Sequence, residues 1–315
     1  MSKVVMIFAL AAAMLFCAPV SAKTGYAAPL KVVATIFPVY DFVRAVAGDK
    51  VTLSMLARPG SEVHSFDPSP QDILLIRNAD VFIYIGGESD TWVKTLMKSS
   101  EPLDQTAVRL IEHVSAVKEE TVEGMQTEEE EHGHEEEHEE DYDEHIWTSP
   151  RNAILMIGAI ADALSAADPS NAGEYRARAD RYADEIRALG EEVKTLVGSA
   201  KRKTIVFGDR FPFRYFTDEF GLEYRAAFPG CHTQTDVSVA TMAYLINFVK
   251  DGSIPAVYAL ELSNGNIARG IAQETGAEML TLHSYHNVAR ADFDSGVTYA
   301  DLMRRNLENL RKGLY

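Results

Sequence analysis

The chain has 315 residues, 46% of them hydrophobic, and a formal net charge of -17 at pH 7. This length is enough for two domains with separate hydrophobic cores. The negative charge, together with the lack of a basic patch, argues against nucleic acid as a partner, because phosphate would be repelled.

The amino-terminal segment has the features of an export signal. Lys3 precedes an apolar stretch over residues 4–19, and small residues follow it, which predicts a cleaved signal peptide at 1–22. The stretch is short for a membrane anchor. Lipid modification at Cys17 is the alternative. We expect an exported protein, in the periplasm or at the outer face of the cytoplasmic membrane, that keeps Cys231 alone and forms no intrachain disulfide.

Beyond the signal, the pattern predicts an α/β protein with two lobes, each a small parallel sheet flanked by helices. Short runs rich in β-branched residues alternate with helical patterns, as in βα units. These runs occupy 30–36, 51–56 and 81–85 in the first half and 204–207, 256–260 and 279–282 in the second. We assign 29–167 to an amino-terminal lobe and 203–315 to a carboxyl-terminal lobe.

A long rigid helix is expected to join the lobes over residues 168–200. Asp168-Pro169-Ser170 offers a capping residue followed by proline at the first helical position, and apolar residues then recur at spacings of three and four. A helix from Pro169 to about Val197 is about 40 Å long at 1.5 Å per residue. Such a helix would limit hinge motion between the lobes.

The first lobe contains an acidic, histidine-rich segment at 119–144. Its 26 residues hold fifteen carboxylates, no lysine or arginine, and three histidines, His132, His134 and His138. Imidazole binds zinc, copper and nickel, so the segment is a candidate for accessory zinc collection. A solvated acidic loop with incidental histidines is the alternative. In either case we expect the segment to be disordered without metal and to lie in neither core.

Four residues follow predicted strands or precede helices at positions where α/β lobes bind ligands. These are His64, His145, Asp209 and His283. Any one of them alone could be an ordinary surface or hydrogen-bonded residue. Together, two from each half, they supply three imidazoles and one carboxylate, which suit a tetrahedral zinc site.

Three further residues near these positions are weaker candidates. Glu261 follows a predicted strand and could orient a ligand imidazole from outside the metal shell, or cap the next helix. Cys231 and His232 are zinc-binding residue types, although a single cysteine is as often a buried apolar residue.

Two motifs give the chain a family resemblance. Val63-His64-Ser65-Phe66-Asp67 and Asp143-Glu144-His145-Ile146-Trp147-Thr148-Ser149-Pro150 resemble the patterns Pro-His-x-Tyr/Phe-Glu/Asp and Asp-Pro-His-x-Trp-x-x-Pro of zinc/manganese-specific solute-binding proteins of ABC transporters. The similarity covers nearly the whole mature sequence. It implies two lobes joined by a rigid helix, with His64 and His145 as metal ligands.

The chain departs from this family in the second lobe. Where the family has a third histidine, this chain has Asp209, or Arg210 in a gapless match, and Arg210 cannot bind a metal cation. The family's carboxylate position holds His283, and His286 could replace it if the loop winds differently.

The resemblance implies a receptor that captures zinc between two lobes and delivers it to an ABC transporter permease. We expect a monomer without enzymatic activity. Manganese is the alternative cargo, although it prefers more oxygen ligands than this set offers. An exported zinc hydrolase is a weaker alternative, because the chain has no HExxH motif or Gly-x-Ser-x-Gly elbow. A metal buffer or adhesin could use the same fold.

Overall fold

The fold is described from a computed structural model that covers residues 28–98, 106–126, 142–230 and 236–315. The predicted signal peptide, the histidines His132, His134 and His138, and the pair Cys231 and His232 lie outside the described residues. None of the helices in these ranges is long and apolar enough to span a membrane.

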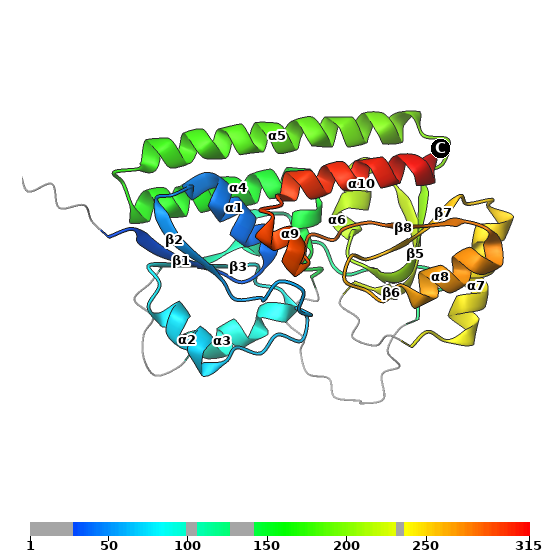
Figure 1. Cartoon of the computed structure of the whole chain (residues 1–315), viewed down its shortest axis with the longest axis horizontal. Helices are drawn as coiled ribbons and strands as arrows, with labels where there is room; N and C mark the ends of the chain where they lie inside the picture. Colours follow the sequence, from blue (N-terminus) through cyan, green and yellow to red (C-terminus); the bar gives the residue numbers. More distant parts are fainter. Residues whose placement is uncertain (1–27, 99–105, 127–141, 231–235) are drawn as a thin grey trace, which may run out of the picture.

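The amino-terminal lobe is built on a four-stranded parallel sheet in the order β2-β1-β3-β4 (Figure 1). Its strands are β1 (Leu30–Ala34), β2 (Val51–Met55), β3 (Val81–Tyr84) and β4 (Thr106–Arg109). Side chains alternate between its faces, so Val32 packs towards α1 (Phe37–Ala47) and α4 (Pro150–Ala167), and Val33 packs towards α2 (Pro70–Arg77) and α3 (Thr91–Met97). Both faces are therefore buried, as parallel sheets require.

The carboxyl-terminal lobe repeats this plan with the strand order β6-β5-β7-β8. Its strands are β5 (Thr204–Phe211), β6 (Glu223–Pro229), β7 (Ala256–Ala259) and β8 (Glu278–Thr281), and its other helices are α6 (Arg214–Phe220), α7 (Val239–Asp251) and α8 (Asn266–Thr275). The short helix α9 (Arg290–Asp294) lies against the first lobe, where Phe293 packs beside Tyr40. The predicted class, two parallel sheets flanked by helices, is confirmed. The sequence prediction missed β4 and β6.

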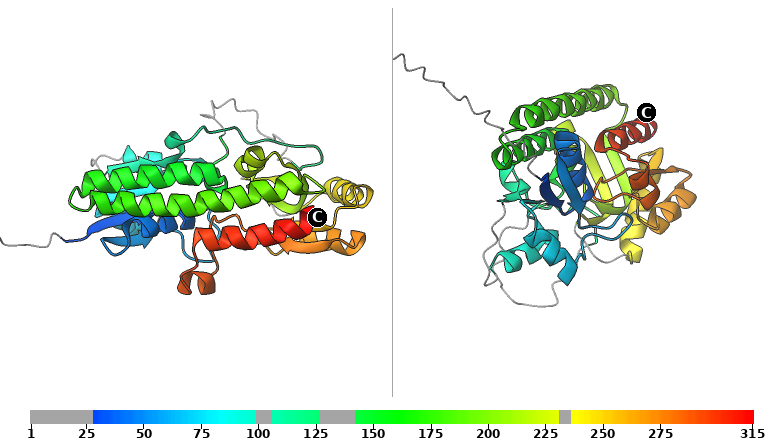
Figure 2. Two further views of the ribbon diagram at one scale, coloured as in Figure 1. Left: turned by 90° about the horizontal axis from the view of Figure 1, so that it is seen from above. Right: turned by 60° about the vertical axis from the view of Figure 1, so that its left-hand side comes forward.

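Two helices, not one, connect the lobes. In Figures 1 and 2, α5 (Ala172–Ser199) runs along both lobes, and α10 (Tyr299–Leu314) lies beside it from the junction of the lobes across the second sheet. Ile186 of α5 and Leu302 of α10 are buried in the first core, whereas Leu196 and Leu310 are buried in the second. Each helix therefore ties the two cores together.

The start of α5 differs from the prediction. The helix begins at Ala172, because the Asp168 side chain accepts hydrogen bonds from the Ser170 backbone and from the Asn171 side chain. These bonds stabilise a turn over Pro169, which closes the hairpin between α4 and α5 before the helix begins.

The expectation that the whole acidic segment lies in neither core is wrong at its amino-terminal end. Val122 and Met125 pack against the second core. The Gln126 backbone N–H donates to the Ala227 carbonyl of β6 over 2.9 Å, and the Ser238 N–H donates to the Gln126 side chain. The few apolar residues in this segment are enough to anchor it to the second lobe.

Candidate metal centre

Three histidines converge where the lobes meet. His64, His145 and His286 each offer a ring nitrogen, and these three atoms lie within 4.8 Å of one another. The Nε2 atoms of His64 and His145 are 3.3 Å apart. Two nitrogens bound to one tetrahedral zinc ion at about 2.0–2.1 Å are themselves about 3.3 Å apart. The geometry therefore fits a shared zinc ion.

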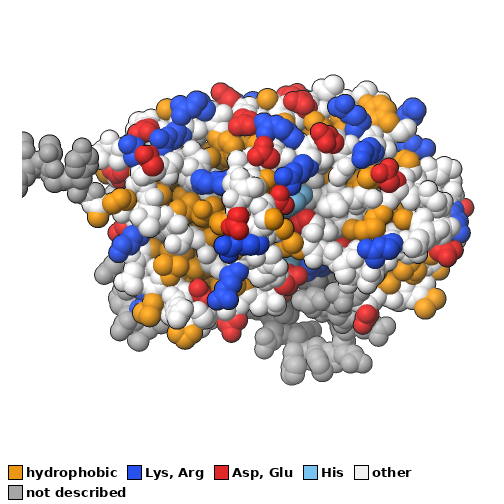
Figure 3. Space-filling view, in the orientation of Figure 1, with side chains coloured by type: hydrophobic (Ala, Val, Ile, Leu, Met, Phe, Trp, Pro, Cys, Tyr) orange, Lys and Arg blue, Asp and Glu red, His pale blue; other side chains and the backbone are white. Residues whose placement is uncertain are grey.

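Each histidine lies beyond the sheets at the ends where parallel strands present their ligands. His64 follows β2, His286 follows β8, and His145 precedes the short helix η3 (Ile146–Thr148) that leads into α4. His145 and His286 are buried, and His64 is partly exposed. Figure 3 shows pale blue histidine atoms in the middle of the molecule, between the lobes.

The two histidines of the first lobe share one local arrangement. A carboxylate two residues earlier contacts both the backbone N–H and Nδ1 of the histidine: Asp143 for His145 at 2.8 and 2.9 Å, and Glu62 for His64 at 3.1 and 2.8 Å. When the carboxylate accepts the proton on Nδ1, the Nε2 lone pair is free to bind metal. Both rings thus point the correct nitrogen at the site.

The surroundings shift the pKa values of His145 and His286 in opposite directions. Burial lowers the pKa of His145, but the Asp143 charge and hydrogen bond more than offset it, so the pKa is raised. Burial, and then the nearby His64 and His145, hold the pKa of His286 well below its ordinary value. His286 is thus neutral and able to bind metal over a wide pH range.

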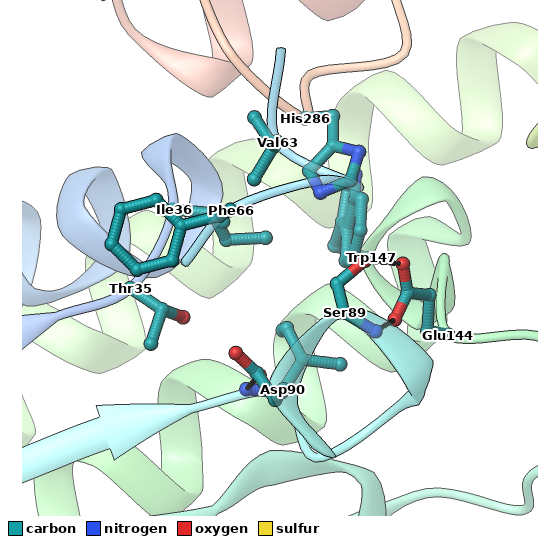
Figure 4. A pocket seen from close by; sticks show the side chains of 10 residues that line it. Thr35, Ile36, Val63, Phe66, Ser89, Asp90, Glu144, Trp147 and His286 are labelled. Atoms are coloured by element: carbon teal, nitrogen blue, oxygen red, sulfur yellow. Dashed lines mark hydrogen bonds between the residues drawn. The ribbon is translucent and has the colours of Figure 1, made fainter. Parts of the chain in front are cut away.

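His286 is positioned by contacts from distant parts of the chain. Glu261 accepts hydrogen bonds from the backbone and hydroxyl of Ser284, and Trp147 Nε1 donates to the Ser284 carbonyl over 2.8 Å. The Trp147 ring also lies against His286, with ring centroids 4.8 Å apart. Figure 4 shows these two side chains next to each other, beside the apolar side chain of Val63.

Two other features define the shape of this loop. Tyr285 has a φ of 64°, a left-handed conformation that a bulky residue adopts only when its surroundings impose it. Asn287 Nδ2 donates to the carbonyls of Arg58 and Ser61 over 2.8 and 2.9 Å. Asn287 therefore fastens the loop that carries His286 to the turn that leads into His64.

Sequence comparison places this chain in a known family. Residues 32–313 match the sequence profile of the family described as zinc-uptake complex component A, periplasmic. The chain belongs to this family. The family description agrees with the expected export of the protein from the cytoplasm, and it bears out the resemblance drawn from the two histidine motifs.

Individual relatives support the assignment. The zinc-binding protein AdcA of Streptococcus pyogenes is 30% identical over 293 residues, which are 90% of this chain and 55% of that protein. The chain thus spans about half the length of these streptococcal relatives. The high-affinity zinc uptake system protein ZnuA of Bacillus subtilis is 28% identical and matches over 90% of this chain and 88% of its own. These proteins are named for binding and uptake, in agreement with the expectation that this chain is not an enzyme.

Solved structures show the same fold. The Zn(II)-bound ZnuA-like domain of Streptococcus pneumoniae AdcA superposes with a TM-score of 0.75 at 25% identity and covers 91% of this chain and 99% of its own. The laminin-binding protein of Streptococcus agalactiae, described as having adhesin and metal transporting activity, gives a TM-score of 0.76 at 26% identity, over 91% of this chain and 100% of its own.

Of the residues predicted in the second lobe, Asp209 does not join the three histidines. Strand β5 continues beyond Phe207 to Phe211, with a register shift between Phe207 and Arg210, so Asp209 lies within the strand. Its carboxylate accepts hydrogen bonds from the backbone N–H groups of Arg210 and Leu260, at 2.9 and 3.3 Å. Asp209 therefore links β5 to the end of β7.

His283 also stays outside the group, and His286, the alternative, takes the place expected for it. The His283 backbone donates to Asn306, and its Nδ1 accepts from the Tyr285 N–H over 2.9 Å. Glu261 lies 3.5 Å from His283 Nδ1. Its hydrogen bonds with Ser284 show that Glu261 holds the loop itself, and it does not orient one of the three clustered rings.

Sequence reasoning missed three residues that shape the site. Glu62 and Asn287 gave no signal beyond their closeness to His64 and His286 in the chain. Arg210 was noticed as the gapless match to the family's third histidine and set aside because it cannot bind metal. The structure places its guanidinium in the pocket beside His64 and Glu62.

Proposed function

We propose that this protein is an exported receptor that captures zinc with His64, His145 and His286 and delivers it to the permease of an ABC transporter. The observation that carries the proposal is the convergence of three imidazoles, of which His64 and His145 have their Nε2 atoms at a separation that fits tetrahedral zinc. The family and the names of the relatives support the same cargo. Because both halves of the site come from one chain, we propose that a monomer suffices.

Nitrogen ligands favour zinc over manganese in this site. Manganese prefers carboxylate, carbonyl and water oxygens, whereas imidazole suits zinc. Among the described residues, the group contains three histidines and no carboxylate. The fourth position of a tetrahedral ion could be taken by water or by Cys231 or His232, which remain candidates from the sequence alone.

The fold favours capture with small movements of the lobes. Since α5 and α10 each pack into both cores, a wide hinge motion would break contacts in two places. Zinc would exchange its water shell for imidazoles that their carboxylate partners already orient. We therefore propose that loop ordering accompanies binding, and that the two sheets keep their relative orientation.

Zinc affinities of single variants test the ligand set. Chelator competition on His64→Ala, His145→Ala and His286→Ala should each show affinity lowered by about tenfold or more, since water only partly replaces a lost ligand. His113→Ala, an exposed histidine away from the group, is the control and should bind as the wild type does. Wild-type zinc affinity in His286→Ala, together with lowered affinity in His283→Ala, would show that the loop places His283 at the metal in the zinc-bound protein.

Transport needs a separate test in cells. Deleting the gene should slow growth at low zinc, and the wild-type gene should restore growth whereas the His145→Ala gene should not. Growth restored by a variant that no longer binds zinc would contradict a role in uptake while leaving the binding site itself intact.

A further inference from the structure

Arg210 reaches the metal centre from the second lobe. Its Nη1 lies 3.2 Å from His64 Nδ1, and its Nη2 donates to Glu62 Oε2 over 3.1 Å. Arg210 and Glu62 line the same pocket as His64, His145 and His286. A guanidinium has no lone pair for a metal and keeps its positive charge. Its presence beside a cation site therefore calls for a role other than coordination.

The two oxygens of Glu62 have different partners. Oε1 accepts hydrogen bonds from the backbone N–H groups of Val63 and His64 at 2.9 and 3.1 Å and lies 2.8 Å from His64 Nδ1. These local contacts fix one side of the carboxylate. Oε2 is held by Arg210 from across the interface between the lobes. Without Arg210, this second oxygen would be an anionic ligand atom at the edge of the pocket.

We propose that Arg210 sets the metal selectivity of the site by holding Glu62 out of the coordination sphere. This inference rests on the proposed zinc ligands His64, His145 and His286. Three imidazoles and one carboxylate still suit zinc, but a carboxylate that joined the imidazoles would add an oxygen ligand and so reduce the disadvantage of manganese in this site. By engaging Oε2, Arg210 keeps the site rich in nitrogen and directs Glu62 to orient His64 instead.

The ratio of manganese to zinc affinity separates this role from a simple charge effect. Removing the Arg210 charge should strengthen the binding of both dications to a similar extent, because they carry the same charge. Only a change in the ligand set should alter the ratio. In Arg210→Ala, manganese should gain about 10–100-fold over zinc, the range typical of residues that support metal ligands.

The experiment measures zinc and manganese affinities by chelator competition in Arg210→Ala, Glu62→Gln and the double variant. Adding Glu62→Gln to Arg210→Ala should return the ratio to that of Glu62→Gln alone. The visible spectrum of the Co²⁺-loaded protein should change in Arg210→Ala and not in the double variant relative to Glu62→Gln. Arg290→Ala, which breaks an exposed pair with Asp294, is the matched control and should leave the ratio unchanged.

An unchanged ratio in Arg210→Ala would overturn the proposal, and so would a shift that persists in the double variant, since Glu62 would then not be the cause. Arg210→Met keeps the aliphatic stem and supplies the same test if the alanine variant does not fold. Failure of the zinc site itself would appear differently, as wild-type zinc affinity that does not depend on His64 or His145.

Discussion

The two halves of the metal centre are built in different ways. In the first lobe, Asp143 and Glu62 each orient a histidine two residues later in the chain. In the second lobe, the residue two positions before His286 is Ser284, whose hydroxyl accepts only from the His286 backbone N–H and not from its ring. Trp147, Glu261 and Asn287 position this loop from distant parts of the chain. A metal ligand whose orientation depends on local contacts can be recognised in a short motif. A metal ligand whose orientation depends on distant contacts can be recognised only in the completed fold.

Among the changes that test this difference between the two lobes, Asp143→Asn is expected to lower zinc affinity most. The amide can still contact Nδ1 but carries no charge, so the His145 ring loses the partner that fixes its tautomer. Zinc affinity should fall by about 10–100-fold at pH 7.5, as measured by chelator competition. Asp162→Asn, at an exposed aspartate on α4, is the control. Wild-type affinity in Asp143→Asn would show that the local carboxylate is dispensable.

The pH dependence of binding should distinguish the same two halves. Since Asp143 raises the pKa of His145, protons compete with zinc for Nε2 as the pH falls through the ordinary histidine range, whereas His286 stays neutral. Zinc affinity should fall by at least about tenfold from pH 7.5 to pH 5.5. In Asp143→Asn, the largest influence that opposes burial is lost. The pKa of His145 should therefore fall, although Glu144 and Glu119 still raise it, and the decline in affinity should move to lower pH. Identical pH profiles would contradict this account.

A smaller effect is expected from Asn287→Ala. This change removes two hydrogen bonds to the turn before His64 but leaves all three ligands in place. Two bonds of roughly 1 kcal/mol each set an upper limit of about thirtyfold, and zinc affinity should fall by about threefold to tenfold because the bonds act on the loop and not on the metal. Asn264→Ala, on an exposed loop of the second lobe, is the control. A thermal melt of the zinc-free protein should show whether the loss instead reflects general instability.

The smallest effect on the tight site is expected from removing residues 127–141. If His132, His134 and His138 collect zinc at low affinity, this deletion should abolish weaker sites in a calorimetric titration and leave one tight site unchanged. Because Val122, Met125 and Gln126 bind the second lobe, the deletion must begin after them. Equal stoichiometry in both proteins would mean that the segment does not gather zinc.

The sequence by itself determined much of the fold. Runs such as 30–36 and 204–207 predict parallel strands, because β-branched residues fill a sheet that is buried on both faces. It did not determine β4 and β6, each of which is one of the two edge strands of its sheet. Both carry residues that interrupt a strand pattern, such as Arg109 in β4 and Pro229 in β6, so their patterns are weaker than those of the other edge strands, β2 and β8.

The same division holds for the site. His64 and His145 were predicted as ligands from the two family motifs, and the structure brings both into the group of three histidines. Asp143, which orients His145, lies in its motif, whereas Glu62, which orients His64, lies just outside the other one. Only the tertiary structure brings His286, and not His283, beside His64 and His145, since the direction of each ring depends on the left-handed Tyr285 and on contacts from distant segments. It also leaves Asp209 apart from the three histidines, because β5 continues past the predicted end of the strand. A contact between neighbouring residues can be predicted from the sequence, whereas the direction of a side chain in a loop depends on every element that packs against it.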